Sequence, residues 1–349
     1  MKRIALLLSA TALLACRDRQ ASAPASEGMQ TSQELPVLKD GRLEALSEAF
    51  YDLIPRQANL EILAEGHDWT EGPLWVAKEG YLLYSDIPRN AVYKWDPAEG
   101  SRLYLQPSGF LGEDFQGEEP GSNGLLLDPE GRLVLCQHGD RRVARMTARL
   151  ESPAPEFETL AGSFEGKRLN SPNDAIYDSR GNLYFTDPPY GLPGLMDDPG
   201  KELDFQGVYR LDTAGKLTLL TREFTRPNGL ALSPDEQKLY IANSDPEQAI
   251  WKVFDLPAVG SLGPGKTFFD ATDRTATELG LPDGMKVHKK GFVFATGPGG
   301  IYVFAPDGTL LGRILTGQAT ANCAFNQDQT ALFITADAYL LKLELLPVN

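Results

Sequence analysis

The arrangement of apolar and polar residues repeats six times along most of the chain. Each copy begins with a polar residue, continues into an apolar strand pattern, turns, and returns through a second apolar strand pattern. The copies are "EGPLWVAKEGYLLYSD", "NGLLLDPEGRLVLCQH", "NDAIYDSRGNLYFTD", "NGLALSPDEQKLYIAN", "DGMKVHKKGFVFATG" and "NCAFNQDQTALFITA". They begin at Glu71, Asn123, Asn173, Asn228, Asp283 and Asn322. Further strand patterns lie between successive copies, so most repeats hold about four strands.

The spacing of the copies indicates the fold. Successive first residues are 52, 50, 55, 55 and 39 residues apart. Four-stranded repeats of this length are typical of β-propellers, so the chain is predicted to be all-β, with a six-bladed propeller over residues 59–347. The last repeat ends near Leu345 after three strand patterns. We therefore expect the early strand Leu60–Glu65 to complete the last blade, which leaves no open sheet edge.

The residues before the propeller show a different period. Leu43, Leu46, Phe50 and Leu53 recur at helical spacing, and Pro55 ends the pattern. Residues 41–58 are therefore predicted to form a short amphipathic N-terminal helix and a lead-in to the first strand.

The N-terminus has the features of a targeting segment. A basic pair is followed by the apolar run Ile4–Leu14, which is too short to span a bilayer. The run ends in "LLAC", which resembles a bacterial lipobox. Residues 1–16 are thus predicted to be a lipoprotein signal peptide that leaves Cys16 lipidated, and residues 17–40 a flexible tether. An ordinary secretory signal with an incidental cysteine is the alternative.

This interpretation gives an expected location. The chain would be lipid-anchored in a bacterial cell envelope and would face the periplasm. Arg17 follows the cysteine, where an aspartate would resemble an inner-membrane retention signal, so the outer membrane is favoured. Cys136 and Cys323 lie in apolar strand patterns and are expected to be buried free thiols. A disulfide between them is the alternative in an oxidising compartment.

Composition and charge exclude some partners. The chain has 349 residues, of which 42% are hydrophobic, enough for a large core. It carries 48 Asp and Glu against 33 Lys and Arg, with no basic run, which argues against nucleic acid. "GSLGPGKT" at 260–267 formally satisfies a phosphate-binding pattern, but a strand pattern rather than a helix follows it. Nucleotide binding is therefore not predicted.

The polar residues that open the repeats are the candidate chemistry. In a propeller the first strand of each blade lines the central channel, so these six residues would meet at one mouth of it. The second strands return to that mouth, where their last residues would form an outer ring. These residues are Asp86, His138, Asp187, Asn243, Gly297 and Ala336. Carboxylate and amide oxygens without sulfur suit a hard cation such as Ca²⁺ or Mg²⁺. A Ca²⁺ that only ties blades together is the structural alternative.

Four motifs carry a resemblance to a known family. They are Glu71-Gly-Pro, Ser171-Pro-Asn173-Asp174, Arg226-Pro-Asn228-Gly and Leu281-Pro-Asp283-Gly. In order and spacing they resemble the SMP-30/gluconolactonase family over roughly residues 61–345, and "RLNSPNDAIYDSRGNLYFTDPPYG" is similar to its bacterial gluconolactonase branch. The resemblance implies a six-bladed propeller with one divalent cation, usually Ca²⁺ and otherwise Zn²⁺, Mn²⁺ or Mg²⁺. It also implies hydrolysis of lactones, while related branches act on phosphotriesters.

The resemblance assigns roles to individual residues. The implied metal ligands are Glu71, Asn173, Asn228 and Asp283. Asp283 is also implied as the general base, with Glu71 and Asp187 as rivals. Asn123 belongs to the same ring but matches the ligand set less well, so it is expected to contact substrate. The other expected substrate contacts are His138, Asp187, Arg168, Asn170 and Tyr190.

Together these features predict a metal-dependent hydrolase that opens a sugar lactone. The loops 107–121 and 192–206 are long enough to cover the site. Ordinary surface loops are the alternative, because they would have the same length and composition. A metal-dependent esterase or phosphotriesterase is one alternative. A ligand-binding propeller with a structural Ca²⁺ and no catalysis is the other.

Overall fold

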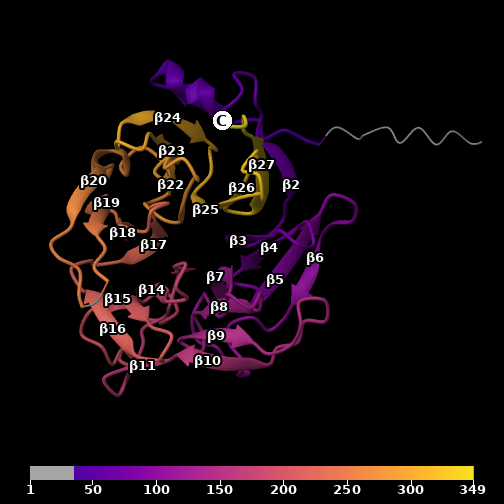
Figure 1. Ribbon diagram of the computed structural model, residues 1–349. Coiled ribbons are helices and arrows are strands. Elements are labelled where there is room, and N and C mark those ends of the chain that lie inside the picture. The colour runs from indigo at the N-terminus through magenta and orange to yellow at the C-terminus, as the bar shows by residue number, and fades with distance from the viewer. Residues whose placement is uncertain (1–34, 259, 349) are drawn as a thin grey trace, which may run out of the picture. The chain divides into compact units, whose positions relative to one another are not determined.

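The computed structural model describes residues 35–258 and 260–348, which form a ring of six antiparallel sheets (Figure 1). The prediction of a six-bladed β-propeller is confirmed. The first strand of each of the six repeats lies innermost in its sheet and contacts the first strands of neighbouring blades around the central channel. The start of each repeat is therefore brought to the middle of the ring.

The blades follow one another in sequence order. From the centre outwards, blade 1 contains β3 (Thr70–Val76), β4 (Tyr81–Asp86), β5 (Ala91–Asp96) and β6 (Gly100–Leu105), and blade 2 contains β7 (Ser122–Leu127), β8 (Leu133–Gln137), β9 (Arg142–Met146) and β10 (Phe157–Ala161). Blade 3 contains β13 (Ala175–Tyr177), β14 (Leu183–Asp187), β15 (Gly207–Leu211) and β16 (Leu217–Thr221), and blade 4 contains β17 (Pro227–Leu232), β18 (Lys238–Asp245), β19 (Gln248–Asp255) and β20 (Lys266–Asp270). Blade 5 contains β21 (Met285–Val287), β22 (Val293–Gly297), β23 (Gly300–Phe304) and β24 (Leu310–Leu315). Outside the blades lie the hairpin β11 (Ser163–Phe164) and β12 (Lys167–Arg168), and the short 3-10 helices η2 (Leu195–Asp197) and η3 (Thr272–Arg274).

Blade 6 is built from both ends of the described chain. Its inner strands are β25 (Thr320–Phe325), β26 (Ala331–Ala336) and β27 (Tyr339–Glu344). Its outermost strand is β2 (Glu61–Ala64), which pairs antiparallel with β27. The predicted closure of the ring by an early strand is confirmed, and it leaves β27 with partners on both sides.

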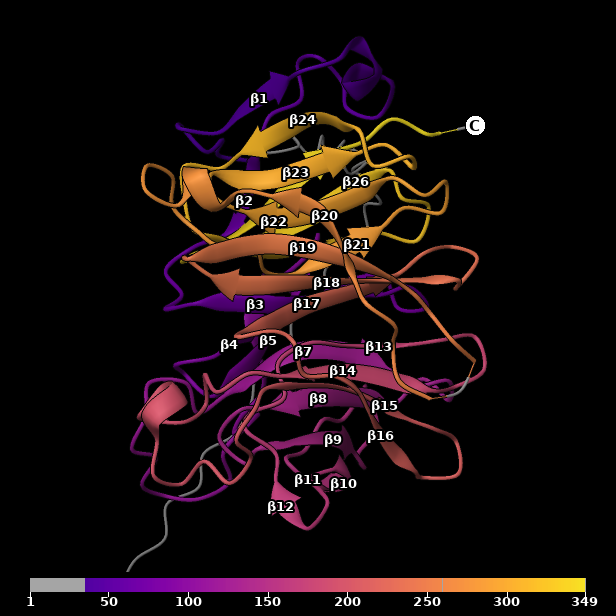
Figure 2. The same ribbon diagram turned by 90° about the vertical axis from the view of Figure 1, so that its left-hand side faces the viewer.

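The amphipathic α-helix predicted within residues 41–58 is wrong. The segment forms strand β1 (Arg42–Ala45), which pairs with β24 as a fifth strand of blade 5, and then the 3-10 helix η1 (Glu48–Asp52) (Figure 2). Pairing with β24 satisfies backbone groups that a helix would satisfy internally. Phe50 and Leu53 still reach the core between blades 5 and 6, whereas Leu46 is 58% exposed.

The described chain begins to pack on the propeller earlier than predicted. Leu38 is buried and donates its backbone N–H to Leu60, and Pro36 accepts from Ile62. Residues 36–40 therefore belong to the folded unit rather than to the tether. The predicted signal peptide, the lipidation of Cys16 and the tether up to residue 34 lie outside the described residues. Among the described residues, no helix has the length and apolarity that crossing a bilayer requires.

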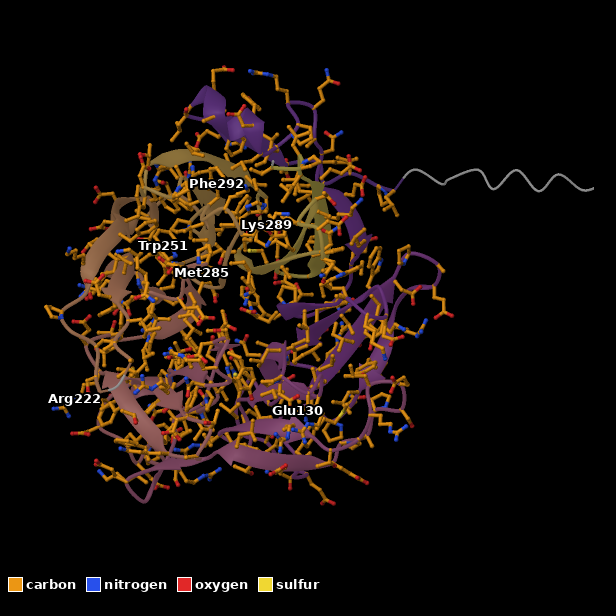
Figure 3. The ribbon with its side chains drawn as sticks, viewed as in Figure 1. Glu130, Arg222, Trp251, Met285, Lys289 and Phe292 are labelled. Atoms are coloured by element: carbon orange, nitrogen blue, oxygen red, sulfur yellow. The ribbon has the colours of Figure 1, made fainter. Side chains whose placement is uncertain are left out.

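The core consists of apolar layers between adjacent blades. Trp251 of β19 and Met285 of β21 belong to one such layer, between blades 4 and 5 (Figure 3). Cys136 and Cys323 are buried in separate blades and are free, as expected, and burial raises the pKa of both thiols. These layers hold the inner strands in a fixed ring, which positions the residues at the channel mouth.

Candidate metal centre and active site

A cavity of about 480 Å³ lies over the beginnings of the inner strands. Five of the six residues that open the repeats line it: Glu71, Asn123, Asn173, Asn228 and Asp283. Its other polar lining residues are Glu119, Tyr190, Arg226, Ser244, Thr275, Glu278 and Thr320. Trp69, Ile87, Leu279 and Leu281 contribute apolar surface. A concave site of this size with convergent polar groups is the expected form of a small-molecule site.

Irregular backbone aims the opening residues into this cavity. The β3–β4 pairing shifts register between Glu71 and Leu74, and equivalent shifts follow the starts of β7, β17 and β25. In blades 3 and 5 the regular strand begins only after Asn173 and Asp283. Because bulges and strand ends break the alternation of side chains, they can turn a polar residue toward the channel while the following residues pack in the core.

The glycines after the opening residues allow the inner strands to approach closely. A Cβ at Gly72 would lie 2.1 Å from the carbonyl oxygen of Asn123, and one at Gly229 would lie 2.2 Å from that of Asp283. A Cβ at Gly124 or Gly284 would likewise come within 2.8 Å of an atom of the next blade's opening residue. These Glu-Gly, Asn-Gly and Asp-Gly pairs are therefore packing contacts between blades rather than hairpin turns.

The sixth opening residue is held away from the cavity. Asn322 donates from Nδ2 to Oε2 of Glu71 over 3.1 Å. Its Oδ1 accepts from the backbone of Cys323 and from Nζ of Lys286, over 2.9 and 3.2 Å. Asn322 thus fixes one carboxylate oxygen of Glu71 and connects it to the cation of Lys286.

The opening residues Glu71, Asn123, Asn173, Asn228 and Asp283 form a ring of oxygen donors at the cavity, called the oxygen ring. Four of these donor oxygens have no partner within the described chain. Oδ1 of Asn123, Asn173, Asn228 and Asp283 is buried and makes no hydrogen bond. A buried polar atom without a partner costs free energy, so four such oxygens around one cavity indicate a place where they bind something else.

Glu71 and Asp283, the two carboxylates of the oxygen ring, lie where burial disfavours their charged forms. Burial raises the pKa of Glu71 to about 7, and a hydrogen bond from the backbone of Gly72 opposes this shift. Burial raises the pKa of Asp283 well above its usual range, and the negative charge of Glu71 adds to that shift. A cation between the two acids would offset both effects.

This donor set fits a hard divalent cation. It offers carboxylate and amide oxygens that are buried, unpartnered and directed at one space, and it contains neither sulfur nor imidazole. In the part of the chain that the structure describes, no cluster of three or more His, Cys, Asp or Glu side chains is arranged for a metal. The oxygen ring is not such a cluster, because three of its five residues are asparagines. Asn123 presents its oxygen as Asn173 and Asn228 do, so the structure does not separate it from the implied ligands.

The predicted outer ring does not face the cavity. Asp187 accepts from the backbone N–H of Asn170, and Asn243 accepts in the same way from Arg226, each 17 residues earlier. Asp86 accepts from the backbone of Trp69 over the same interval. These side chains hold the segment that leads into the inner strand of their own blade. The prediction that they face the central site is wrong, because each uses at least one oxygen to accept from a backbone amide and none of the three lines the cavity.

Two other expected substrate contacts are also placed elsewhere. Arg168 is exposed on β12, and its guanidinium donates to the carbonyl of Asp140. Asn170 is buried and donates from Nδ2 to the carbonyls of Asp187 and Phe205. Both side chains are thus used to hold the segment before Asn173, Arg168 against the β8–β9 loop of blade 2 and Asn170 against blade 3.

The other expected contacts lie at or beside the cavity. Asn123 and Tyr190 line it, and burial raises the pKa of the Tyr190 phenol. His138 is fully buried behind the lining, where its Nδ1 lies 2.8 Å from Oε2 of Glu119. Its Nε2 is buried without a partner.

Sequence reasoning missed three charged residues of the cavity: Glu119, Arg226 and Glu278. Glu278 accepts a hydrogen bond from the guanidinium of Arg313 over 2.6 Å. Glu119 lies in the acidic loop 107–121, for which the sequence predicts only a possible cover of the site. Arg226 belongs to the Arg226-Pro-Asn228-Gly motif and is half-buried, and its guanidinium makes no hydrogen bond or ion pair to any described residue. The acidic composition of the loop was a signal for Glu119, but no sequence period placed it over the ring.

The fold and this site define a six-bladed β-propeller with an acid-lined cavity over the oxygen donors at its channel mouth. A sequence profile of the "SMP-30/Gluconolactonase/LRE-like region" matches residues 69–338. The chain therefore belongs to the SMP-30/gluconolactonase/LRE-like family.

Individual relatives agree with this assignment. A gluconolactonase of Zymomonas mobilis is 39% identical over 304 residues, which cover 85% of this chain and 84% of the relative. A pentonolactonase of Haloferax volcanii is 27% identical over 270 residues, 76% of this chain and 80% of the relative. The solved structure of a gluconolactonase from Xanthomonas campestris superposes with a TM-score of 0.76 at 32% identity, covering 89% of this chain and 97% of that one.

Proposed function

We propose that this protein hydrolyses a sugar lactone with the help of one divalent cation held by Glu71, Asn173, Asn228 and Asp283. The observation that carries the proposal is the set of unpartnered buried oxygens under the cavity. Relatives named gluconolactonase and pentonolactonase support lactones as the substrate class. Ca²⁺ is the favoured cation because all donors are oxygens, and Mg²⁺, Mn²⁺ and Zn²⁺ are the alternatives.

A bound divalent cation would polarise the lactone carbonyl and stabilise the negative charge that develops on its oxygen. The chain's own residues bind and orient the lactone and accept the proton of the attacking water. Trp69, Ile87 and Leu281 give the cavity apolar surface against which the carbon skeleton of the lactone can pack. Asn123 and Tyr190 offer polar contacts to the sugar ring.

Asp283 is the proposed general base. Its carboxylate lines the cavity, and while one of its oxygens holds the cation the other can accept the proton of the attacking water. The new carbon–oxygen bond forms as that proton is taken up. The bond from the carbonyl carbon to the ring oxygen then breaks, and the proton passes to the ring oxygen, which becomes the hydroxyl of the product hydroxy acid.

The test is release of acid from a panel of aldonolactones, followed with a pH indicator in the presence and absence of EDTA. We expect Asp283→Ala to lose about 1,000-fold or more in kcat/KM, since it removes both a ligand and the base. Asp255→Asn is a control for charge, because that carboxylate is exposed on β19 and forms an ion pair with Lys238.

Each other outcome points to a different function. EDTA-sensitive hydrolysis of carboxylic or phosphoric esters without hydrolysis of lactones would favour the esterase or phosphotriesterase alternative. A bound cation without hydrolysis of any ester would favour a ligand-binding propeller. Full activity of Asp283→Ala would show that the reaction takes place elsewhere.

A further inference from the structure

The carboxylate of Glu119 has a fixed place in the cavity wall. It lies at the end of the loop between β6 and β7, and its side chain is 32% exposed. The backbone beside it is tightly packed: a Cβ on Gly109 or Gly139 would come within 2.4 or 2.6 Å of the carbonyl oxygen of Pro120. Gly121 also donates its N–H to the carbonyl of Ile87 over 3.0 Å. Glu119 is therefore held by a rigid segment rather than by a mobile loop tip.

His138 holds one oxygen of this carboxylate. Its Nδ1 lies 2.8 Å from Oε2 of Glu119, and its backbone N–H donates to the carbonyl of Gly121 over 3.1 Å. The imidazole is fully buried, and Gly191 packs so closely that a Cβ there would lie 2.6 Å from the carbonyl oxygen of His138. Glu119 makes no other hydrogen bond or ion pair to a described residue, so Oε1 is free to face the cavity.

The chemistry of a lactone decides what this free oxygen can bind. A carboxylate accepts hydrogen bonds and donates none. The carbonyl and ring oxygens of a lactone also only accept, so they would be repelled by Glu119. The hydroxyl groups are the only hydrogen-bond donors of an aldonolactone. A fixed carboxylate outside the oxygen ring therefore distinguishes hydroxylated lactones from plain ones.

We propose that Glu119 is a specificity-determining residue that accepts hydrogen bonds from the hydroxyl groups of the substrate, and that His138 is its positioning residue. This inference rests on the proposed lactonase function and names the feature of the lactone that the site recognises. It assigns the acidic loop 107–121 a direct part in recognition.

The experiment compares two six-membered lactones, D-glucono-δ-lactone and δ-valerolactone, which lacks hydroxyl groups. For Glu119→Ala we expect kcat/KM for gluconolactone to fall about 10- to 100-fold, the effect of losing a hydrogen bond to a charged group. For δ-valerolactone we expect a change of about twofold or less, within the effect usual for a surface substitution. Glu119→Gln keeps the size of the side chain and should show a smaller selective loss. Glu118→Gln is the matched control, because Glu118 is exposed and does not line the cavity.

His138 is tested by the same selectivity. His138→Phe keeps a ring but removes the nitrogen that meets Glu119, and it should lower the preference for gluconolactone. His138→Asn keeps a hydrogen-bond donor near the position of Nδ1 and should restore much of that preference. A merely structural histidine would lower the turnover of both lactones together and would not be rescued selectively.

Binding separates this inference from the proposed function. The probes are D-glucono-δ-lactam and δ-valerolactam, which bind without being hydrolysed, and calorimetry measures their affinity. If the wild type hydrolyses neither lactone, the proposed function fails, while a selective loss of gluconolactam affinity in Glu119→Ala would still support the inference. Equal losses for hydroxylated and plain ligands, or no loss for gluconolactone and its lactam, would overturn it.

Discussion

Asparagine residues have two different roles in this propeller, and the role of each depends on its position in the blade. At the start of the inner strands, the side-chain oxygens of Asn123, Asn173 and Asn228 are buried and unpartnered. At the end of a second strand, Asn243 uses its oxygen to hold the backbone of Arg226. The first kind of asparagine leaves its side-chain oxygen available to bind a ligand. The second kind uses its oxygen to stabilise the fold. Residue type alone therefore does not identify a site residue here.

Asp187 should make the stability of the protein depend on pH. Burial raises the pKa of this carboxyl to about 7. The folded state thus disfavours its ionised form, and the stability present at low pH is lost as pH rises through that value. Asp187→Asn removes the titrating group. We expect the unfolding temperature of the variant, relative to wild type, to rise between about pH 4 and about pH 8.

The measurement is thermal unfolding of both proteins across this pH range, with EDTA present throughout. Asp255→Asn serves as the control, because Asp255 is exposed. A difference between wild type and Asp187→Asn that stays constant with pH would show that Asp187 does not titrate in this way.

At the level of elements, the close contact between inner strands sets the geometry of the ring. Gly229 lies where any side chain would meet the carbonyl of Asp283 in the next blade. We expect Gly229→Ala to destabilise the protein by about 1–3 kcal/mol and to weaken cation binding, because blades 4 and 5 must separate.

Denaturant unfolding and cation titration would measure these two effects. Gly263→Ala is the control, since a Cβ there meets nothing within 4 Å and its backbone is not in the left-handed region. If Gly229→Ala matched wild type in both measurements, close strand packing would not be what shapes the ring.

The sequence was sufficient to predict the hairpins and the residues that open them. It was not sufficient to predict how the backbone segments outside the hairpins run and what they contact. The register of apolar residues placed Glu71 and Asp283 at one mouth, because strand alternation and repeat spacing are local properties. The role of Asp187 depends on a backbone amide that arrives from outside the repeat. The segment around Leu43 has a helical period but pairs with β24, about 270 residues away, which no local pattern reveals.

Glu119 illustrates the same limit within the site. Its loop has no period, and its place in the cavity wall depends on the packing of Gly109 and Gly139 against Pro120 and on the contact with His138. The residues that open the repeats could therefore be predicted from the sequence, whereas residues whose place depends on distant backbone, such as Glu119 and Asp187, required the structure.

For the whole molecule, the outer strand of blade 6 determines whether the ring is closed. A chain that starts at Glu65 would lack β1 and β2 and would expose the edges of β24 and β27. We expect it to unfold at a lower temperature and to aggregate, because an open edge pairs with other chains. A chain that starts at Leu35 keeps β1 and β2 and should behave like the full chain.

Light scattering and thermal unfolding of the two truncated chains would compare these effects. Equal solubility and equal unfolding temperatures would mean that β1 and β2 do not protect the edges of blades 5 and 6.

The central claim is that one cation in the ring of Glu71, Asn173, Asn228 and Asp283 is required for lactone hydrolysis. The most direct test strips the protein with EDTA, removes the chelator, and titrates Ca²⁺ while bound metal and the rate of gluconolactone hydrolysis are measured on the same sample. We expect hydrolysis to be absent at first, to rise with bound metal, and to reach its maximum at about one cation per chain. Full hydrolysis by the stripped protein, or a rate unrelated to bound metal, would contradict this account.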